Sequence, residues 1–187
     1  MSRKNWSISW SLNRRIIIAV VVATASLCGI ISCGYRITPS AENVGADVRK
    51  VFVESFGNKT SEAKIENVFR SAFIEQFVRG GRFNLVANKG EADAVLSGEV
   101  RSMTTAPLSY RKDNLAVEER MTIIIDLSFR TTDKGKIIWM DKEFSGNEFY
   151  VLSSRDLSVV DASRRKALVK LARDTAERAY GLMMSGF

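Results

Sequence analysis

The clearest pattern in this sequence runs through Met121-Thr-Ile-Ile-Ile-Asp-Leu-Ser-Phe-Arg130. Large apolar residues alternate there with mostly polar ones; the apolar set is Met121, Ile123, Ile125, Leu127 and Phe129. Successive side chains of a β-strand point to opposite faces, so the alternation predicts a strand with one buried face and one wet or half-covered face. Residues 133–136 (DKGK) then have the composition of a hairpin turn, and residues 137–144 (IIWMDKEF) are predicted to return antiparallel.

The remaining elements follow from composition and spacing. Runs of β-branched and aromatic residues predict strands at 48–56, 82–87 and 94–103. Apolar residues spaced by three and four predict amphipathic helices at 61–79 and 161–183. Because of Pro107 and several polar residues, 104–115 is predicted as a loop, and 146–160 as a mixed segment. The sequence thus predicts an α+β fold in which both helices pack on one face of a mostly antiparallel sheet of four strands, or five if 82–87 is a strand.

The N-terminal segment has the features of an export signal. Arg14 and Arg15 precede an uncharged apolar run at residues 16–31, which is shorter than the roughly 20 residues of a bilayer-spanning helix. The sequence Ile30-Ile-Ser-Cys33-Gly34 resembles the bacterial lipobox, in which cleavage precedes an acylated cysteine. Cys28 does not fit, because Leu27 is too bulky for the position before the cut.

These features predict a signal peptide at 1–32, a lipidated tether at 33–47 and one domain at 48–187. The alternative is an uncleaved N-terminal anchor. Several acyl chains on Cys33 would anchor the protein durably in a membrane. Gly34 favours the outer membrane, because an aspartate after the cysteine retains enterobacterial lipoproteins at the inner membrane.

Composition narrows the function. The sequence has no histidine, which removes the usual general base and the usual zinc ligand. Four of its 28 basic residues and none of its 21 acidic residues lie in 1–32, so over half of the net charge of +7 belongs to that segment. No partnership with nucleic acid is therefore expected. No glycine-rich phosphate loop or paired carboxylates stand out, and we expect neither an enzyme nor a bound cofactor or metal.

One loop carries candidate binding residues. Leu108-Ser-Tyr-Arg-Lys112 places an aromatic ring beside two cations. Arg111 and Lys112 could hold phosphates, and Tyr110 could lie against acyl or sugar surface. Arg155 is a further cation that could hold a phosphate. The alternative for all three cations is a solvated surface.

Several of these features together resemble the LptE family of lipopolysaccharide-assembly lipoproteins. They are the Cys33-Gly-Tyr-Arg36 start, residues 92–100 (ADAVLSGEV), Tyr110-Arg111 before Val117-Glu-Glu-Arg120, and the terminal amphipathic helix. The resemblance implies two helices on a four-stranded sheet and no catalysis. It also implies a plug inside the outer-membrane β-barrel LptD that helps the barrel to assemble and binds lipopolysaccharide. The family's basic lipopolysaccharide contact falls on Arg111 by motif, whereas Lys112 and Arg155 are added on charge and predicted proximity.

A second resemblance leaves another function open. Residues 51–60 (VFVESFGNKT), a helix and then 81–86 (GRFNLV) are similar to the opening of the curli-secretion and penicillin-binding-protein-activator lipoproteins. That reading implies a secretion-channel subunit or a regulator of cell-wall synthesis. The final helix and the central hairpin fit the LptE family better. A third, plainer possibility is an unspecialised periplasm-facing lipoprotein.

Overall fold

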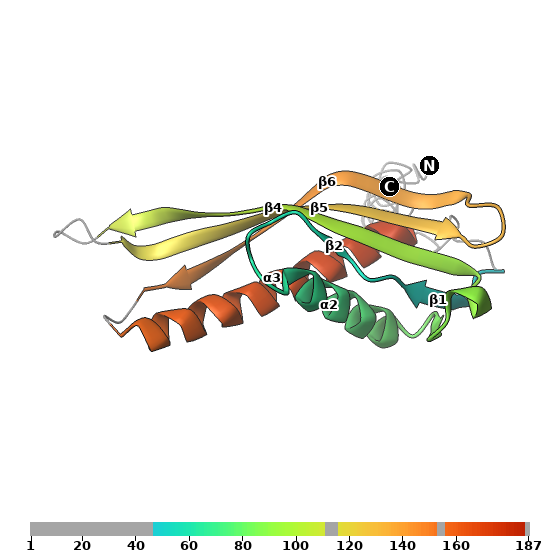
Figure 1. The fold of residues 1–187 in the computed structure, drawn as a ribbon, viewed down its shortest axis with the longest axis horizontal. Coiled ribbons are helices and arrows are strands. Elements are labelled where there is room, and N and C mark those ends of the chain that lie inside the picture. Colours follow the sequence, from blue (N-terminus) through green and yellow to red (C-terminus); the bar gives the residue numbers. More distant parts are fainter. Residues whose placement is uncertain (1–46, 111–115, 153–155, 186–187) are drawn as a thin grey trace, which may run out of the picture. The chain divides into compact units, whose positions relative to one another are not determined.

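The structure is a computed structural model that describes residues 47–110, 116–152 and 156–185. Figure 1 shows its helices and strands. In chain order they are β1 (Lys50–Val53), β2 (Gly57–Asn58), α2 (Ile65–Gly80), β3 (Asn84–Leu85), the short 3-10 helix η1 (Lys89–Glu91), β4 (Ala94–Tyr110), β5 (Ala116–Thr131), β6 (Ile137–Val151) and α3 (Leu157–Ser185).

The strands form one mixed sheet in the order β3-β1-β4-β5-β6, with β2 also paired to β4. β1 runs parallel to both β3 and β4, whereas β4, β5 and β6 form an antiparallel meander. Both helices lie on the same side of this sheet (Figure 1). The predicted α+β class and helix placement are confirmed, and 82–87 contributes a two-residue edge strand, β3.

Three predicted boundaries were wrong. β4 continues to Tyr110, through residues predicted as a loop, because Pro107 sits in a strand with a free edge, where proline is tolerated. β6 continues to Val151 instead of ending at 144, and α3 begins at Leu157 instead of 161. Register shifts at Val100/Ser102 and Ile125/Leu127 let the long strands stay paired while they bend.

The core lies between the helices and the sheet. The apolar set of β5, from Met121 to Phe129, is fully buried against it, as the alternation predicts. From α2, Phe69, Phe73 and Phe77 enter the same core. Rings from α2, β5, α3 and the segment just before β3 meet around Phe77, whose centroid lies 5.5 Å from that of Phe83, 5.9 Å from Phe129 and 5.2 Å from Tyr180. Among the described helices, none combines the length and apolarity needed to cross a membrane.

The sheet extends well past α2. β2 makes its last pair with β4 at Val100, yet β4, β5 and β6 continue together (Figure 1). We call this extension the ribbon; it comprises residues 102–110, 116–124 and 145–151. Beneath the ribbon lies only the N-terminal half of α3, whereas both helices cover the rest of the sheet (Figure 1). The ribbon is therefore the part of the described domain with the thinnest cover.

Candidate functional site

The far end of the ribbon brings two chain segments together. Tyr110 pairs with Ala116 where β4 gives way to β5, and Glu118 pairs with Val151 at the end of β6. The Leu152 N–H also donates a hydrogen bond to the Val117 carbonyl oxygen, at 2.8 Å. Segments 111–115 and 153–155 therefore start from neighbouring points of one sheet end. We call the described residues around them, 106–110, 116–120, 149–152 and 156–160, the tip.

The predicted site residues fall outside the described residues. Arg111 and Lys112 belong to segment 111–115, Arg155 belongs to 153–155, and Cys33 lies before residue 47. What the structure describes is where the flanking residues lie. Those flanks place the two cation-bearing segments at the same end of the sheet, although the sequence separates them by some 40 residues.

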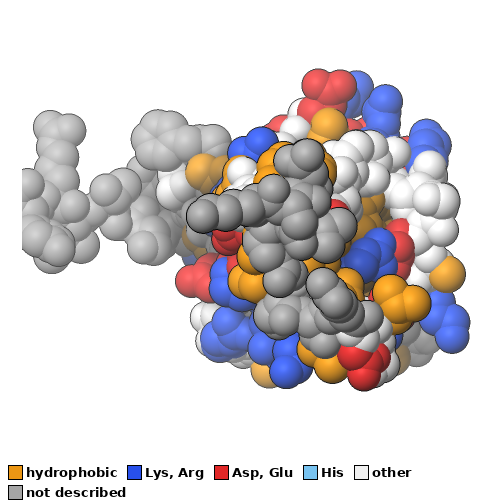
Figure 2. All heavy atoms as spheres, turned by 90° about the vertical axis from the view of Figure 1, so that its left-hand side faces the viewer, with side chains coloured by type: hydrophobic (Ala, Val, Ile, Leu, Met, Phe, Trp, Pro, Cys, Tyr) orange, Lys and Arg blue, Asp and Glu red, His pale blue; other side chains and the backbone are white. Residues whose placement is uncertain are grey.

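Exposed apolar side chains gather at the tip. Among the described residues, six of the ten large hydrophobic side chains that are exposed belong to it: Leu108, Tyr110, Phe149, Val151, Leu157 and Val159. Leu157 is 78% exposed and Tyr110 is 62% exposed. Figure 2 views the molecule from this end, with hydrophobic and basic side chains interspersed on the surface. Apolar side chains grouped in this way mark an interaction site more often than isolated ones do.

Cations accompany this apolar surface. Arg120 is exposed at the tip, and Arg165 and Lys166 are exposed on the third turn of α3. None of these three side chains forms a hydrogen bond or ion pair with another described residue. By contrast, the nearby Lys170 is bound to both Glu148 and Asp174. The tip and the start of α3 thus combine apolar contact area with positive charge that no described residue neutralises.

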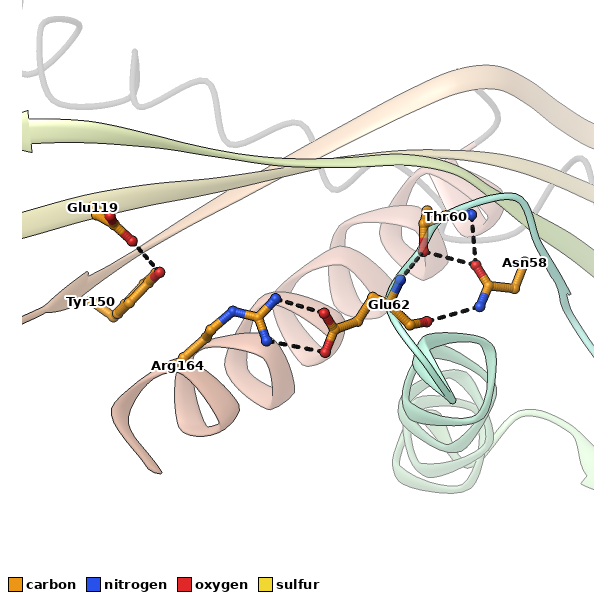
Figure 3. Close-up of polar contacts among 6 residues, drawn as sticks. All are labelled: Asn58, Thr60, Glu62, Glu119, Tyr150 and Arg164. Carbon is orange, nitrogen blue, oxygen red and sulfur yellow. Dashed lines mark hydrogen bonds and ion pairs between the residues drawn. The ribbon is translucent and has the colours of Figure 1, made fainter. Parts of the chain in front are cut away.

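A buried polar contact supports the ribbon from within. The Tyr150 hydroxyl donates a hydrogen bond to the Glu119 carboxylate, between β6 and β5 (Figure 3). Burial, together with this hydrogen bond, raises the pKa of Tyr150 to about 12. The phenol is therefore neutral at physiological pH and holds the two strands together within the tip.

A second contact ties α3 to the rest of the domain. Arg164 binds Glu62 through both guanidinium Nη atoms, at 3.1 and 2.6 Å (Figure 3). The hydrogen bonds from Arg164 lower the pKa of the Glu62 carboxyl below its ordinary value. Glu62 is itself held in a turn: its N–H donates to Thr60 Oγ1, and its carbonyl oxygen accepts from Asn58 Nδ2. These contacts set the position of α3 beneath the ribbon.

Nothing in the described residues resembles a catalytic or metal centre. They contain no group of three or more acidic, cysteine or histidine residues placed to hold a metal ion. What the site offers is a surface for an amphiphilic partner, because exposed apolar side chains lie there near the exposed cations Arg120, Arg165 and Lys166.

A family model for lipopolysaccharide assembly, LptE, matches residues 48–180. The chain belongs to the LptE family. The match spans nearly the whole described domain, including the ribbon and the tip. LptE proteins are non-catalytic lipoproteins of lipopolysaccharide assembly, and the resemblance seen in the sequence is thereby confirmed.

Solved structures are similar to this LptE protein, and two lipoproteins with a TM-score of 0.50 share its fold. Rare lipoprotein B from Shewanella oneidensis is 13% identical, with 74% of this chain and 96% of that chain covered and a TM-score of 0.50. Lipoprotein B from Nitrosomonas europaea is 10% identical, with 74% and 84% covered and a TM-score of 0.50. PelC from Paraburkholderia phytofirmans, a dodecamer, is 15% identical over 79% and 94%, with a TM-score of 0.46. No curated protein sequence matches the chain.

Of the tip, the sequence predicted only Tyr110 as a residue that binds a ligand, next to the candidate cations Arg111 and Lys112. Most of the other tip residues were missed. Residues 146–160 were predicted as a mixed segment, so Phe149, Val151 and Leu157 were not considered as site residues. The run Phe149-Tyr-Val-Leu152 is rich in strand-forming residues and would have extended the preceding strand. That extension is the signal that places the end of β6 beside the start of β5.

Proposed function

We propose that this protein is an outer-membrane lipoprotein that fills the lumen of an LptD-like β-barrel, helps that barrel to assemble, and binds lipopolysaccharide with its tip. The observation that supports the proposal is that the described residues flanking 111–115 and 153–155 lie at one sheet end, among exposed apolar side chains. Lipopolysaccharide has phosphates beside acyl chains, so it needs cations and apolar surface close together. The tip supplies both.

The proposed mechanism requires affinity and no chemistry. Arg111, Lys112 and Arg155 would bind the phosphates, Arg through its planar fork. Leu157 and Tyr110 would cover part of the acyl or sugar surface, removing it from water. Lipid molecules held in this way leave their aggregate, because the same phosphates and chains no longer bind neighbouring lipids.

Anchoring completes the proposal. Removal of a signal peptide at 1–32 would leave Cys33 acylated at the start of the chain. A tether at 33–47 would reach at most about 50 Å when fully extended. The domain at 48–187 could then occupy a barrel while its N-terminus stays in the outer membrane. A role in secretion or in cell-wall synthesis is disfavoured, since the family match is to lipopolysaccharide assembly.

The lipid-binding part is tested by reversing one charge. Arg111→Glu is expected to weaken lipopolysaccharide binding about tenfold, because one favourable phosphate contact becomes repulsive. Lys134→Glu is the matched control: it makes the same charge change in the turn between β5 and β6, where the side chain is exposed. Binding to immobilised lipopolysaccharide should be unchanged for the control. Equal binding by wild type and Arg111→Glu would refute the tip as the lipid site.

The plug is tested by co-purification from detergent-solubilised outer membrane. A tagged wild-type chain should retain a large β-barrel in equal amounts, through high salt, because a plug is held by an extensive interface. Recovery of a cell-wall synthase, or of a ring of the chain itself, would replace the proposal by the activator or channel function.

A further inference from the structure

One edge of the ribbon has no strand beside it. The Leu96 carbonyl oxygen accepts from the Glu54 N–H, and the Val100 carbonyl oxygen accepts from the Lys59 N–H, both at 2.9 Å. These bonds cover that edge of β4 only as far as Val100. From Ser102 to Tyr110, β4 pairs with β5 on one side and with no described strand on the other.

The direction of the backbone groups along this edge can be assigned. Before the register shift at Val100/Ser102, Leu96 and Val100 have side chains that face the helices and carbonyl groups that face β1 and β2. Side-chain face and hydrogen-bonding direction alternate together along a strand. After the shift, Met103 and Thr105 pair with the buried Ile123 and Met121, so they too face the helices. Their N–H and C=O groups therefore point to the free edge.

Pro107 fits the same assignment. It pairs with Glu119, whose side chain meets Tyr150 on the helix-facing side, so its nitrogen also lies at the free edge. Proline there costs no ladder hydrogen bond, which explains why β4 continues through it. The free edge thus offers N–H donors at Met103 and Thr105 and carbonyl acceptors at Met103, Thr105 and Pro107.

The two outer edges of the ribbon are protected very differently. Within the ribbon, β6 has one charged residue, Glu148, and three more, Asp141, Lys142 and Glu143, precede the ribbon in the same strand, with a distortion at Glu143, where φ is +68°. Charges and bulges are the usual means by which an edge strand avoids pairing with other chains. Residues 102–110 have no charge at all, and their interruptions, Pro107 and the register shifts at Pro107/Ser109 and Ser109/Tyr110, all lie beyond Thr105. This edge is therefore open to a further strand as far as Thr105.

We propose that the free edge of β4 at residues 102–107 binds an extended, uncharged segment of the β-barrel partner as an added strand. This deepens the proposed function and rests on it. A second copy is a poorer occupant: nine residues span about 30 Å, and a layer about 10 Å thick buries about 600 Å² over both partners. A stable dimer needs about 1,200 Å² or more. The area buried by strand addition alone is too small for a stable complex of two copies. It suffices within a plug that also contacts the barrel elsewhere.

The test removes one backbone N–H donor at the free edge, and a control variant accounts for the side chain that is lost with it. Thr105→Pro deletes the N–H at the free edge without touching the ladder to β5, and Thr105→Ala is the matched control, since it loses the same side chain but keeps the N–H. Tagged full-length chains are purified from outer membrane with the barrel. We expect Thr105→Pro to retain about fivefold less barrel than Thr105→Ala, with Thr105→Ala equal to wild type. Equal retention by all three would overturn the added strand and leave the plug intact, whereas no barrel with wild type would overturn both.

A second measurement needs no variant. Amide hydrogen exchange of the wild-type chain is compared between the free protein and its complex with the barrel. Exchange at Met103 and Thr105 should slow at least tenfold in the complex, because these amides gain partners. Unchanged exchange at both amides would overturn the inference even if Thr105→Pro fails to fold.

Discussion

Gly146 lets α3 approach β6. It is buried in the strand, and a Cβ built on it would lie 2.6 Å from Thr175 Oγ1 and 3.1 Å from Leu171 Cδ1. Both neighbours belong to the buried face of α3, and among the described residues Thr175 Oγ1 has no hydrogen-bond partner. The absence of a side chain at this residue therefore determines how close the helix lies to the sheet.

Gly146→Ala is expected to lower the free energy of unfolding by about 1–3 kcal/mol, because the added methyl group must displace two packed side chains. Gly181→Ala is the control. That glycine lies in α3 with nothing within 4 Å of a built Cβ, so alanine should be neutral or stabilise by up to about 1 kcal/mol. Denaturant unfolding of both variants gives the two values, and equal stability would contradict the close approach.

At the scale of elements, α3 is the one described helix that lies beneath the ribbon, so its placement governs the tip. The Glu62–Arg164 pair joins it to the turn before α2, across 102 residues of sequence. Lys170 adds a contact to Glu148 on β6, and Ser163 Oγ donates to the Val151 carbonyl oxygen at 3.3 Å. These polar contacts add to the apolar contacts that α3 makes beneath the ribbon through Ala167 and Leu168.

Arg164→Ala should lower the free energy of unfolding by about 1 kcal/mol at neutral pH, as a two-pronged ion pair that is partly screened by water is lost. Arg165→Ala is the control: it removes the adjacent arginine, whose exposed side chain has no described partner. This variant should change the free energy of unfolding by less than about 0.5 kcal/mol. Because Arg164 lowers the pKa of Glu62 from its ordinary 4.5, the pair stabilises the fold above that pH and loses its effect as the pH falls below it. The difference in free energy of unfolding between wild type and Arg164→Ala should therefore shrink in acid. A difference that stays constant with pH would contradict a stabilising Glu62–Arg164 pair.

At the scale of the whole molecule, the proposed function assigns membrane anchoring to the N-terminal segment and lipid binding to the far end of the sheet. The prediction that Cys33 is acylated is tested with Cys33→Ser. This change should move the protein from the outer-membrane fraction to the soluble or inner-membrane fraction. Cys28→Ser is the control, because it changes the other cysteine and should leave fractionation unchanged. Labelling with a fatty-acid analogue gives an independent readout. Incorporation into Cys33→Ser equal to that of wild type would refute the lipidation site.

Local pattern by itself determined the class of fold, the helix-facing set of β5 from Met121 to Phe129, and the family. Alternation and helical spacing are properties of consecutive residues, and burial against one shared core enforces both. Tertiary structure decided the lengths of β4 and β6, because a strand partner compensates for Pro107 and for the polar residues around it. It also decided the composition of the tip, where the exposed Tyr110 and Leu157 belong to the same end of the domain although they lie far apart in sequence. Pairing between distant strands is set by register and packing, and neither is encoded in the order of neighbouring residues.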